Sequence, residues 1–199
     1  MMTQIILASK STHRAQLLDN AGIRFETCSA EIDEREVEKP LLEAELGGSD
    51  IAEVLAISKA THVSEKSRDA YVIGCDQTLS LQGQLLHKPE DMEGARRRLL
   101  ALSGKTHELN SAVAIVRNGE TYWSHVEVSR ITFRKLAPGF IGRHLAAAGE
   151  GVLSSVGAYQ IEGLGVQLFE KIDGDFFSIM GLPLLPLLSK MREMKLVDQ

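Results

Sequence analysis

The segment IILASKSTHRAQLLDNAG, residues 5–22, predicts a buried strand, a polar turn and a helix in direct succession. Ile5 to Ala8 is short and apolar, as expected of a strand within a core. Ser11 or Thr12 is a candidate N-cap of the helix, and Gly22 is a candidate C-cap. The turn therefore directs backbone N–H groups and the positive end of the helix dipole toward one place, which favours a bound phosphate.

Beyond this unit, strands and helices continue to alternate. Apolar periodicity predicts helices over about residues 49–64, 88–102, 138–148 and 184–196. Strands are predicted over residues 71–74 and in three hairpins, which turn at Gly83, at Asn118–Gly119 and at Asp173–Gly174. The last of these hairpins pairs residues 166–172 with 176–181.

The acidic segment EIDEREVEKP, residues 31–40, has no apolar periodicity and predicts a loop around Asp33 and Glu34. The order of elements predicts a mixed α/β fold with an elongated, partly antiparallel central sheet flanked by helices. With 199 residues, 44% of them hydrophobic, the chain can bury a sizeable core. Its length predicts a single domain over residues 1–199, divided into two lobes around a cleft.

The chain carries a formal net charge of −5 at pH 7. This charge argues against a protein that coats nucleic acid, because duplex binding relies on basic side chains that face phosphates. A small anionic ligand is compatible with it, since a few Lys and Arg residues can dominate the potential within a cleft.

The two cysteines, Cys28 and Cys75, lack C-x-x-C spacing, so we expect reduced and mostly buried thiols. The first 18 residues contain too short an apolar run for a signal peptide or a membrane span. Both observations predict a cytoplasmic protein without membrane contacts.

Three groups of polar side chains could take part in catalysis or ligand binding. They are the basic turn Lys10, His13 and Arg14, the acidic pair Asp33 and Glu34, and Asp76. Basic residues near a helix start are commonly solvated, and paired acids in a charged loop commonly lie on the surface. Asp76 follows the apolar run YVIGC, so a buried carboxylate there needs a cationic partner, a metal or the mouth of a cleft. The alternative for Asp76 is a helix or turn cap. Ligands of α/β sheets bind at the carboxyl ends of strands, which favours a site.

Other motifs in the chain are weaker indicators of a function. Gly163 and Gly165 lack the strand and helix context of a dinucleotide fingerprint, and they are interpreted as turn glycines. The histidines show no zinc-binding spacing, and no serine lies in a G-x-S-x-G elbow. The triplet of residues 96–98 (RRR) is predicted to cover a helix face, although one arginine could reach a ligand.

Seven short motifs, in order, resemble those of the Maf family of nucleotide pyrophosphatases across nearly the whole chain. They are LASKSTHRAQLL at 7–18, EIDE at 31–34, SKA at 58–60, GCDQT at 74–78, HKP at 87–89 with ALSGKTHEL at 101–109, GAYQIEGLG at 157–165, and IMGLPL at 179–184. The resemblance implies a hydrolase acting on acid anhydrides, which cuts a nucleoside triphosphate between its α and β phosphates with a divalent cation, Mg²⁺ or Mn²⁺. It also implies a cleft between two lobes and a homodimer.

The resemblance also implies roles for individual residues. The implied phosphate-binding residues are Ser9, Arg14, Lys59 and Lys88. Glu34 would help to hold the metal. Asp76 would be either the general base or a metal ligand that activates water. This set suits phosphoryl transfer, which depends on charge neutralisation and positioning.

The chain departs from the commonest family pattern at positions that the resemblance associates with the choice of base: His13, Gln77 and Glu162. Gln77 and Glu162 match a subgroup that prefers 7-methyl-GTP, whereas His13 matches neither subgroup. A glutamate offers only acceptors, which suit the N1–H and N2–H₂ donors of guanine, while a glutamine suits uracil or thymine. N7-methylated guanine is cationic, which a carboxylate favours further.

These features predict an enzyme that removes non-canonical nucleotides, with 7-methyl-GTP as the candidate substrate. One alternative is a dTTP and UTP pyrophosphatase. Another is a nucleotide-binding regulator of cell division without turnover, against which the retained acidic and basic residues argue.

Overall fold

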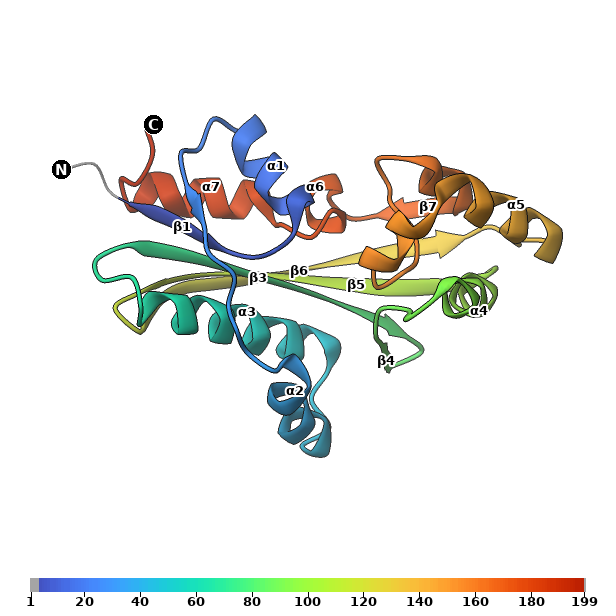
Figure 1. The fold of residues 1–199 in the computed structure, drawn as a ribbon, viewed down its shortest axis with the longest axis horizontal. Coiled ribbons are helices and arrows are strands. Elements are labelled where there is room, and N and C mark those ends of the chain that lie inside the picture. The colour runs from blue at the N-terminus through green and yellow to red at the C-terminus, as the bar shows by residue number, and fades with distance from the viewer. Residues whose placement is uncertain (1–3, 199) are drawn as a thin grey trace.

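The computed structural model describes residues 4–198 and is built on one seven-stranded sheet (Figure 1). Its strands are β1 (Ile5–Ala8), β2 (Glu26–Thr27), β3 (Tyr71–Leu81), β4 (Gln84–Leu86), β5 (Thr106–Arg117), β6 (Glu120–Phe133) and β7 (Phe169–Asp173). The strand order is β2-β1-β3-β5-β6-β7, and β4 pairs with β3. β1 runs parallel to β2 and β3, whereas the other pairs are antiparallel. The prediction of a mixed, partly antiparallel sheet is confirmed.

Helices cover both faces of the sheet (Figure 1). On one side lie α1 (Thr12–Asn20), α6 (Phe176–Ile179) and α7 (Leu184–Glu193), and on the other α2 (Glu34–Glu43) and α3 (Gly48–Ser64). The far end of the molecule carries α4 (Met92–Leu102), α5 (Pro138–Ala148) and the 3₁₀ turns η1 (Glu150–Ser154) and η2 (Leu164–Leu168). Helix α1 begins after Ser11, whose Oγ accepts a hydrogen bond from the backbone N–H of Arg14.

The two largest of the apolar clusters divide the sheet into two lobes. One core joins β1, α1 and α7 and includes Ile73 and Cys75 of β3. The other core, which defines the second lobe, lies against α4 and α5 and includes Leu79 and Leu81 of the same strand. Strand β3 therefore passes from one lobe into the other, and the predicted two-lobed architecture is confirmed.

Gly74 allows α3 to lie unusually close to β3. A Cβ atom built on Gly74 would stand 2.1 Å from the backbone oxygen of Ala56, so no larger residue fits without moving the helix. Ala56 and Ala60 of α3 are fully buried in this contact. Alternate strand residues share a face, so Asp76 faces the same helix as Gly74. This close packing brings Lys59 of α3 to Asp76.

Two element predictions were wrong. Residues 34–43 form α2 rather than a loop, because Asp33 caps the helix by accepting from the backbone N–H groups of Arg35 and Glu36. Residues 176–179 form α6 rather than a strand, because Asp175 caps that turn, and β7 pairs with β6 instead. In both places an acidic N-cap outweighed the local composition.

Two other features differ from expectation: the start of α4 and the exposure of Cys28. Helix α4 begins at Met92 with Asp91 as its N-cap, and not at Lys88. Cys75 is buried, which raises the pKa of its thiol to about 11, whereas Cys28 is exposed. Within residues 4–198, none of the helices combines the length and the apolar character needed to cross a bilayer.

His107, on β5, is buried in the second lobe. We expect it to make the free energy of unfolding depend on pH. Its Nε2 lies 2.8 Å from the hydroxyl of Tyr159. Burial, helped by the charge of Arg98, lowers the pKa of His107 to about 4. A histidine in the unfolded chain titrates near pH 6.5, so between these values only the unfolded chain takes up the proton.

We therefore expect the free energy of unfolding to fall as the pH decreases from about 6.5 to about 4, by about 3 kcal/mol from His107. Urea denaturation across this range measures the change. His107→Gln should remove most of it, whereas His62→Gln, at a partly exposed position of α3, should leave it in place. A remaining slope is assigned to His144, whose pKa is also lowered by burial. An unchanged slope in His107→Gln would contradict the assignment.

Candidate active site

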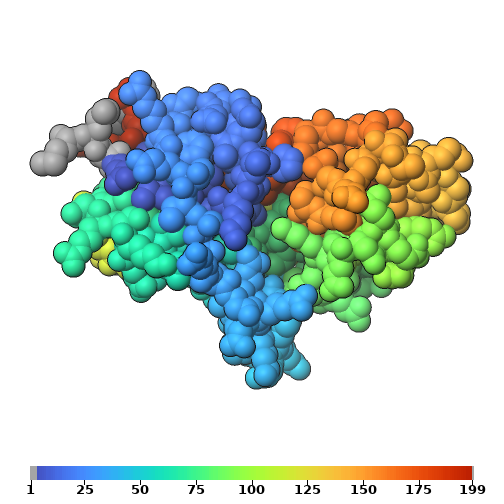
Figure 2. Space-filling view, in the orientation of Figure 1, coloured from blue at the N-terminus to red at the C-terminus, as the bar shows by residue number. Residues whose placement is uncertain are grey.

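A cavity of about 590 Å³ opens between the two lobes. In Figure 2 the surface is hollowed where the blue N-terminal segments meet the green and orange segments of the second lobe. The volume is in the range of small-molecule sites. The cavity brings together all nine predicted site residues: Ser9, His13, Arg14, Glu34, Lys59, Asp76, Gln77, Lys88 and Glu162.

The acidic wall of the cavity consists of Asp76, Glu34 and Glu38. Asp76 does not lie at the end of its own strand, β3. Strand β1 ends at Ala8, which is paired with Gly74, so β3 continues without that neighbour at Asp76. Asp76 therefore stands just beyond the carboxyl end of the parallel pair, the usual position of a ligand in α/β sheets. Its side chain is only 9% exposed.

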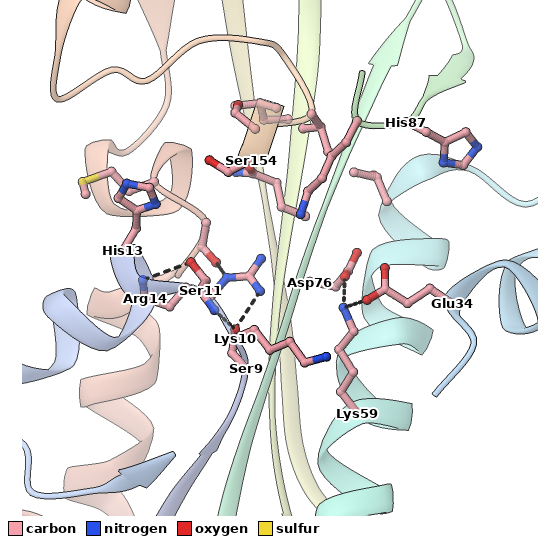
Figure 3. Close-up of a pocket in the computed structure, with 18 of the residues that line it drawn as sticks. Ser9, Lys10, Ser11, His13, Arg14, Glu34, Lys59, Asp76, His87 and Ser154 are labelled. Atoms are coloured by element: carbon pink, nitrogen blue, oxygen red, sulfur yellow. Dashed lines mark hydrogen bonds and ion pairs between the residues drawn. The ribbon is translucent and has the colours of Figure 1, made fainter. Parts of the chain in front are cut away.

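Lys59 links Asp76 to Glu34. Its Nζ lies 2.6 Å from Oδ1 of Asp76 and 2.7 Å from Oε1 of Glu34, and Figure 3 shows both carboxylates directed at this one ammonium. Burial of Glu34 favours its neutral form, but the charges of Lys59, Lys88 and Arg14 outweigh burial, so the pKa of Glu34 is lowered. Glu34 is therefore held as a carboxylate that faces several cations.

Glu38 is a third carboxylate at the cavity, and sequence reasoning missed it. It lies one helical turn after Glu34 on α2 and is only 8% exposed. Burial raises the pKa of Glu38, and the charges of Asp76 and Glu34 raise it further, while His87 opposes them. The i, i+4 spacing from Glu34 could have revealed it, had residues 34–43 been recognised as a helix.

The turn after β1 supplies the basic wall. Nε of Arg14 donates to the carbonyl oxygen of Gly181 over 2.8 Å, and Nη1 donates to that of Cys75 over 2.9 Å. Oγ of Ser9 accepts from the backbone N–H of Ser11 over 3.1 Å and from Nη1 of Arg14 over 3.4 Å. These bonds fix the guanidinium at the start of α1, facing the acidic wall (Figure 3).

Two further lysines line the cavity. Lys10 extends from the turn after β1, and Lys88 comes from the segment between β4 and α4, in the other lobe. Together with Arg14 and Lys59, they bring positive charge to the cavity from both lobes, beside its acidic side chains. Such an arrangement attracts a polyanion despite the negative net charge of the chain.

His13 and Glu162 meet across the cleft. Nε2 of His13, in the first turn of α1, lies 3.1 Å from Oε1 of Glu162, in the segment before η2. Both side chains are about one-third exposed, so the contact is accessible from solvent.

Gln77 points to the face of β3 opposite Asp76. Its Nε2 donates to Oγ of Ser111 over 2.8 Å and to the carbonyl oxygens of Ser178 and Ile179 over 3.1 Å and 3.0 Å. Gln77 thus holds the end of α6, just before Gly181, which accepts from Arg14.

The donor set suits a divalent cation that is shared with a substrate. Residues 4–198 contain no preformed group of three or more metal-ligating side chains. The carboxylates of Glu34 and Asp76 nevertheless lie close together, because both contact the ammonium of Lys59. One or two carboxylates with substrate phosphates form the usual Mg²⁺ site of phosphate-processing enzymes, so the residues fit such an ion.

Fold and site together define an α/β protein with a two-lobed cleft built to receive a phosphorylated anion. The family model of the Maf-like protein matches residues 4–194. The chain therefore belongs to the Maf family.

Similar proteins cover the whole chain. A protein of Brucella suis biovar 1 described as a 7-methyl-GTP pyrophosphatase is 59% identical over 198 residues, which cover 100% of both chains. A protein of Mesorhizobium japonicum with the same description is 57% identical over the same coverage. Among solved structures, a HAM1 protein from Coxiella burnetii matches 66% of this chain and 73% of its own, with 18% identity and a TM-score of 0.41.

Proposed function

We propose that this chain hydrolyses a nucleoside triphosphate between the α and β phosphates, releasing a nucleoside monophosphate and pyrophosphate. The observation that carries the proposal is the group of Asp76, Lys59 and Glu34 on one wall of a cavity whose other walls present Arg14 and Lys88. A triphosphate bears about four negative charges, and its hydrolysis depends chiefly on neutralising and positioning them. The descriptions of the relatives support the same reaction.

The cationic side chains and the turn after β1 bind the phosphates in this proposal. Arg14 is already oriented by two backbone carbonyls, so little freedom is lost when it meets a phosphate oxygen. Ser9 and the start of α1 add a hydroxyl and the positive end of a helix. Lys88 approaches from the opposite lobe.

Asp76 contacts the attacking water. Lys59 holds Oδ1, and among residues 4–198 no side chain donates to Oδ2, which is left for the water or for a cation. As the water oxygen bonds to the α phosphorus, the bond to the bridging oxygen breaks, and pyrophosphate leaves with that oxygen. The proton released by the water passes to the carboxylate.

Glu34 and Asp76 are the residues that would hold Mg²⁺ or Mn²⁺. When bound, the ion supplies positive charge against the phosphate oxygens and acidifies water. Lys59 keeps both carboxylates in place before substrate arrives, since it contacts each of them.

The proposed base is 7-methylguanine, recognised by Glu162 together with His13 and Gln77. Oε1 of Glu162 lies 3.1 Å from Nε2 of His13 in the free protein, and we propose that this carboxylate accepts from the base N–H groups in the complex. We further propose that residues 1–199 work as one domain, that the protein removes modified nucleotides in the cytoplasm, and that it forms a homodimer.

Product identity tests the reaction. Purified protein is incubated with 7-methyl-GTP, GTP, UTP and dTTP in Mg²⁺ or Mn²⁺, and the products are separated. We expect nucleoside monophosphate and pyrophosphate. Nucleoside diphosphate with orthophosphate would assign a different bond, and tight binding without products would favour a regulatory protein.

Glu162→Gln should change the order of preferred substrates. Replacing the carboxylate by an amide introduces a donor where guanine also donates, so kcat/KM for 7-methyl-GTP should fall by on the order of tenfold to a hundredfold relative to UTP and dTTP. The ratio of kcat/KM values for the two substrate types measures the effect. Glu170→Gln, at an exposed position of β7, is the matched control. An unchanged ranking would remove Glu162 from base recognition.

A further inference from the structure

Arg98 of α4 joins two loops that border the cavity. Its Nη2 donates to the carbonyl oxygen of His87 over 2.7 Å, and its Nη1 donates to that of Val156. These acceptors are 69 residues apart in the sequence, since one lies at position 87 and the other at 156. One guanidinium therefore fixes the distance between two segments that no strand pairing joins.

Each of the two loops carries a residue of the proposed site. His87 immediately precedes Lys88, and Val156 begins the segment that leads through Tyr159 to Glu162. Both Val156 and Lys88 line the cavity. Arg98 itself does not line it, so a direct contact with substrate is not its role.

The surroundings of Arg98 indicate a specific role rather than a solvated helix face. Burial lowers the pKa of its guanidinium, so the group is partly removed from water. Its neighbours in the triplet differ, because Arg96 and Arg97 contact Glu93 on the same helix and their side chains are 43% and 67% exposed. A partly buried charge is retained at a cost that its hydrogen bonds must offset.

The first of these loops also lies close to α2. Nδ1 of His87 lies 3.7 Å from Oε2 of the buried Glu38, on the same helix as Glu34. The loop that carries Lys88 thus lies beside α2 and is joined through Arg98 to the segment that carries Glu162.

We infer that Arg98 is a positioning residue. It holds Lys88 and the segment that carries Glu162 at the separation required to bind a single nucleoside triphosphate. This inference rests on the proposed function of the cavity. The planar fork of arginine suits two fixed carbonyls, whereas a lysine ammonium can satisfy one of them well. Arg98 acts on phosphate and base together because both loops depend on the same group.

The test compares Arg98→Met and Arg98→Lys with Arg97→Met, the exposed neighbour on the same helix. We expect Arg98→Met to raise KM for 7-methyl-GTP by on the order of tenfold, with a smaller change in kcat, and Arg98→Lys to restore part of the loss. Amide hydrogen exchange should become faster in both residues 85–89 and residues 154–162 of Arg98→Met. Arg97→Met should match the wild type in both measurements.

Three results would overturn the inference, and the first two are faster exchange in neither loop and a kcat/KM that falls equally in Arg97→Met. A Tm lowered in Arg98→Met with KM unchanged would also overturn it, because that result describes a structural role alone. The exchange experiment needs no turnover. If the wild type cleaves no triphosphate while Arg98→Met still loosens both loops, the proposed reaction fails and the attachment of the loops stands.

Discussion

Asp76→Asn is expected to lower kcat by on the order of 10³-fold or more while the protein remains folded. Asparagine keeps the shape of the side chain but cannot take a proton from water and is a poor ligand for a divalent cation. Lys59 keeps its contact with Glu34 in the variant, so no buried cation is left alone. Single-turnover release of pyrophosphate measures the effect on chemistry.

Asp19→Asn, at an exposed position near the end of α1, is the matched control and should retain full activity. Circular dichroism and the midpoint of urea unfolding show whether both variants keep the fold. If Asp76→Asn kept more than about a tenth of the wild-type kcat, Asp76 could not be the group that activates water, since such groups contribute at least about a hundredfold.

Lys59→Met is expected to damage both stability and catalysis. The Lys59 and Asp76 side chains are only 12% and 9% exposed, so the variant leaves a carboxylate in a poorly hydrated site without its cation. Removing one member of a buried ion pair costs about 3–5 kcal/mol. Loss of one charge that stabilises a phosphoryl transition state costs on the order of a hundredfold in kcat. Urea denaturation and pyrophosphate release measure the two losses.

A double-mutant cycle isolates the ion pair. In the Asp76→Asn background, Lys59→Met should cost much less stability than in the wild type, because the unpaired carboxylate is gone. Lys66→Met serves as the surface control, since Lys66 is 59% exposed and its contacts, with Glu31 at 3.8 Å and with Nε2 of His62 at 2.9 Å, lie on the surface. Such an exposed pair contributes about 0–1 kcal/mol. Equal losses in both backgrounds would mean that the Lys59–Asp76 contact does not stabilise the fold.

Much of the fold was predictable because local signals determine it. The strand of residues 5–8, the hairpin at Asn118–Gly119 and the helix of residues 138–148 all occur as expected. The first depends on a short apolar run, the second on a turn that needs positive φ, and the third on Pro138 and Gly149 at its ends. Helix α2 was missed because its acidic first turn was interpreted as loop composition, although Asp33 is a good N-cap.

The contacts within the candidate site were harder to predict from local sequence patterns. Asp76 could be singled out because a carboxylate after an apolar run needs a partner, but its partners Lys59 and Glu34 come from helices that no local pattern relates to it. The contact of His13 with Glu162 and the attachment of two loops by Arg98 are tertiary as well. Only folding brings such groups together, so spacing in the chain carries no signal for them.

The passage of β3 through both lobes has a consequence for how a nucleotide enters and leaves. Its ladder with β5 runs without a break from Val72, opposite Val116, to Ser80, opposite Glu108. A hinge motion between the lobes would have to bend or twist this continuous ladder, so we expect the sheet beneath the cleft to resist it. We therefore expect access to depend on small movements at the rim, where Glu162 would exchange its contact with His13 for contacts with the base. We expect discrimination between nucleotides to depend on this exchange of partners at the rim, with little change in the sheet beneath the cleft.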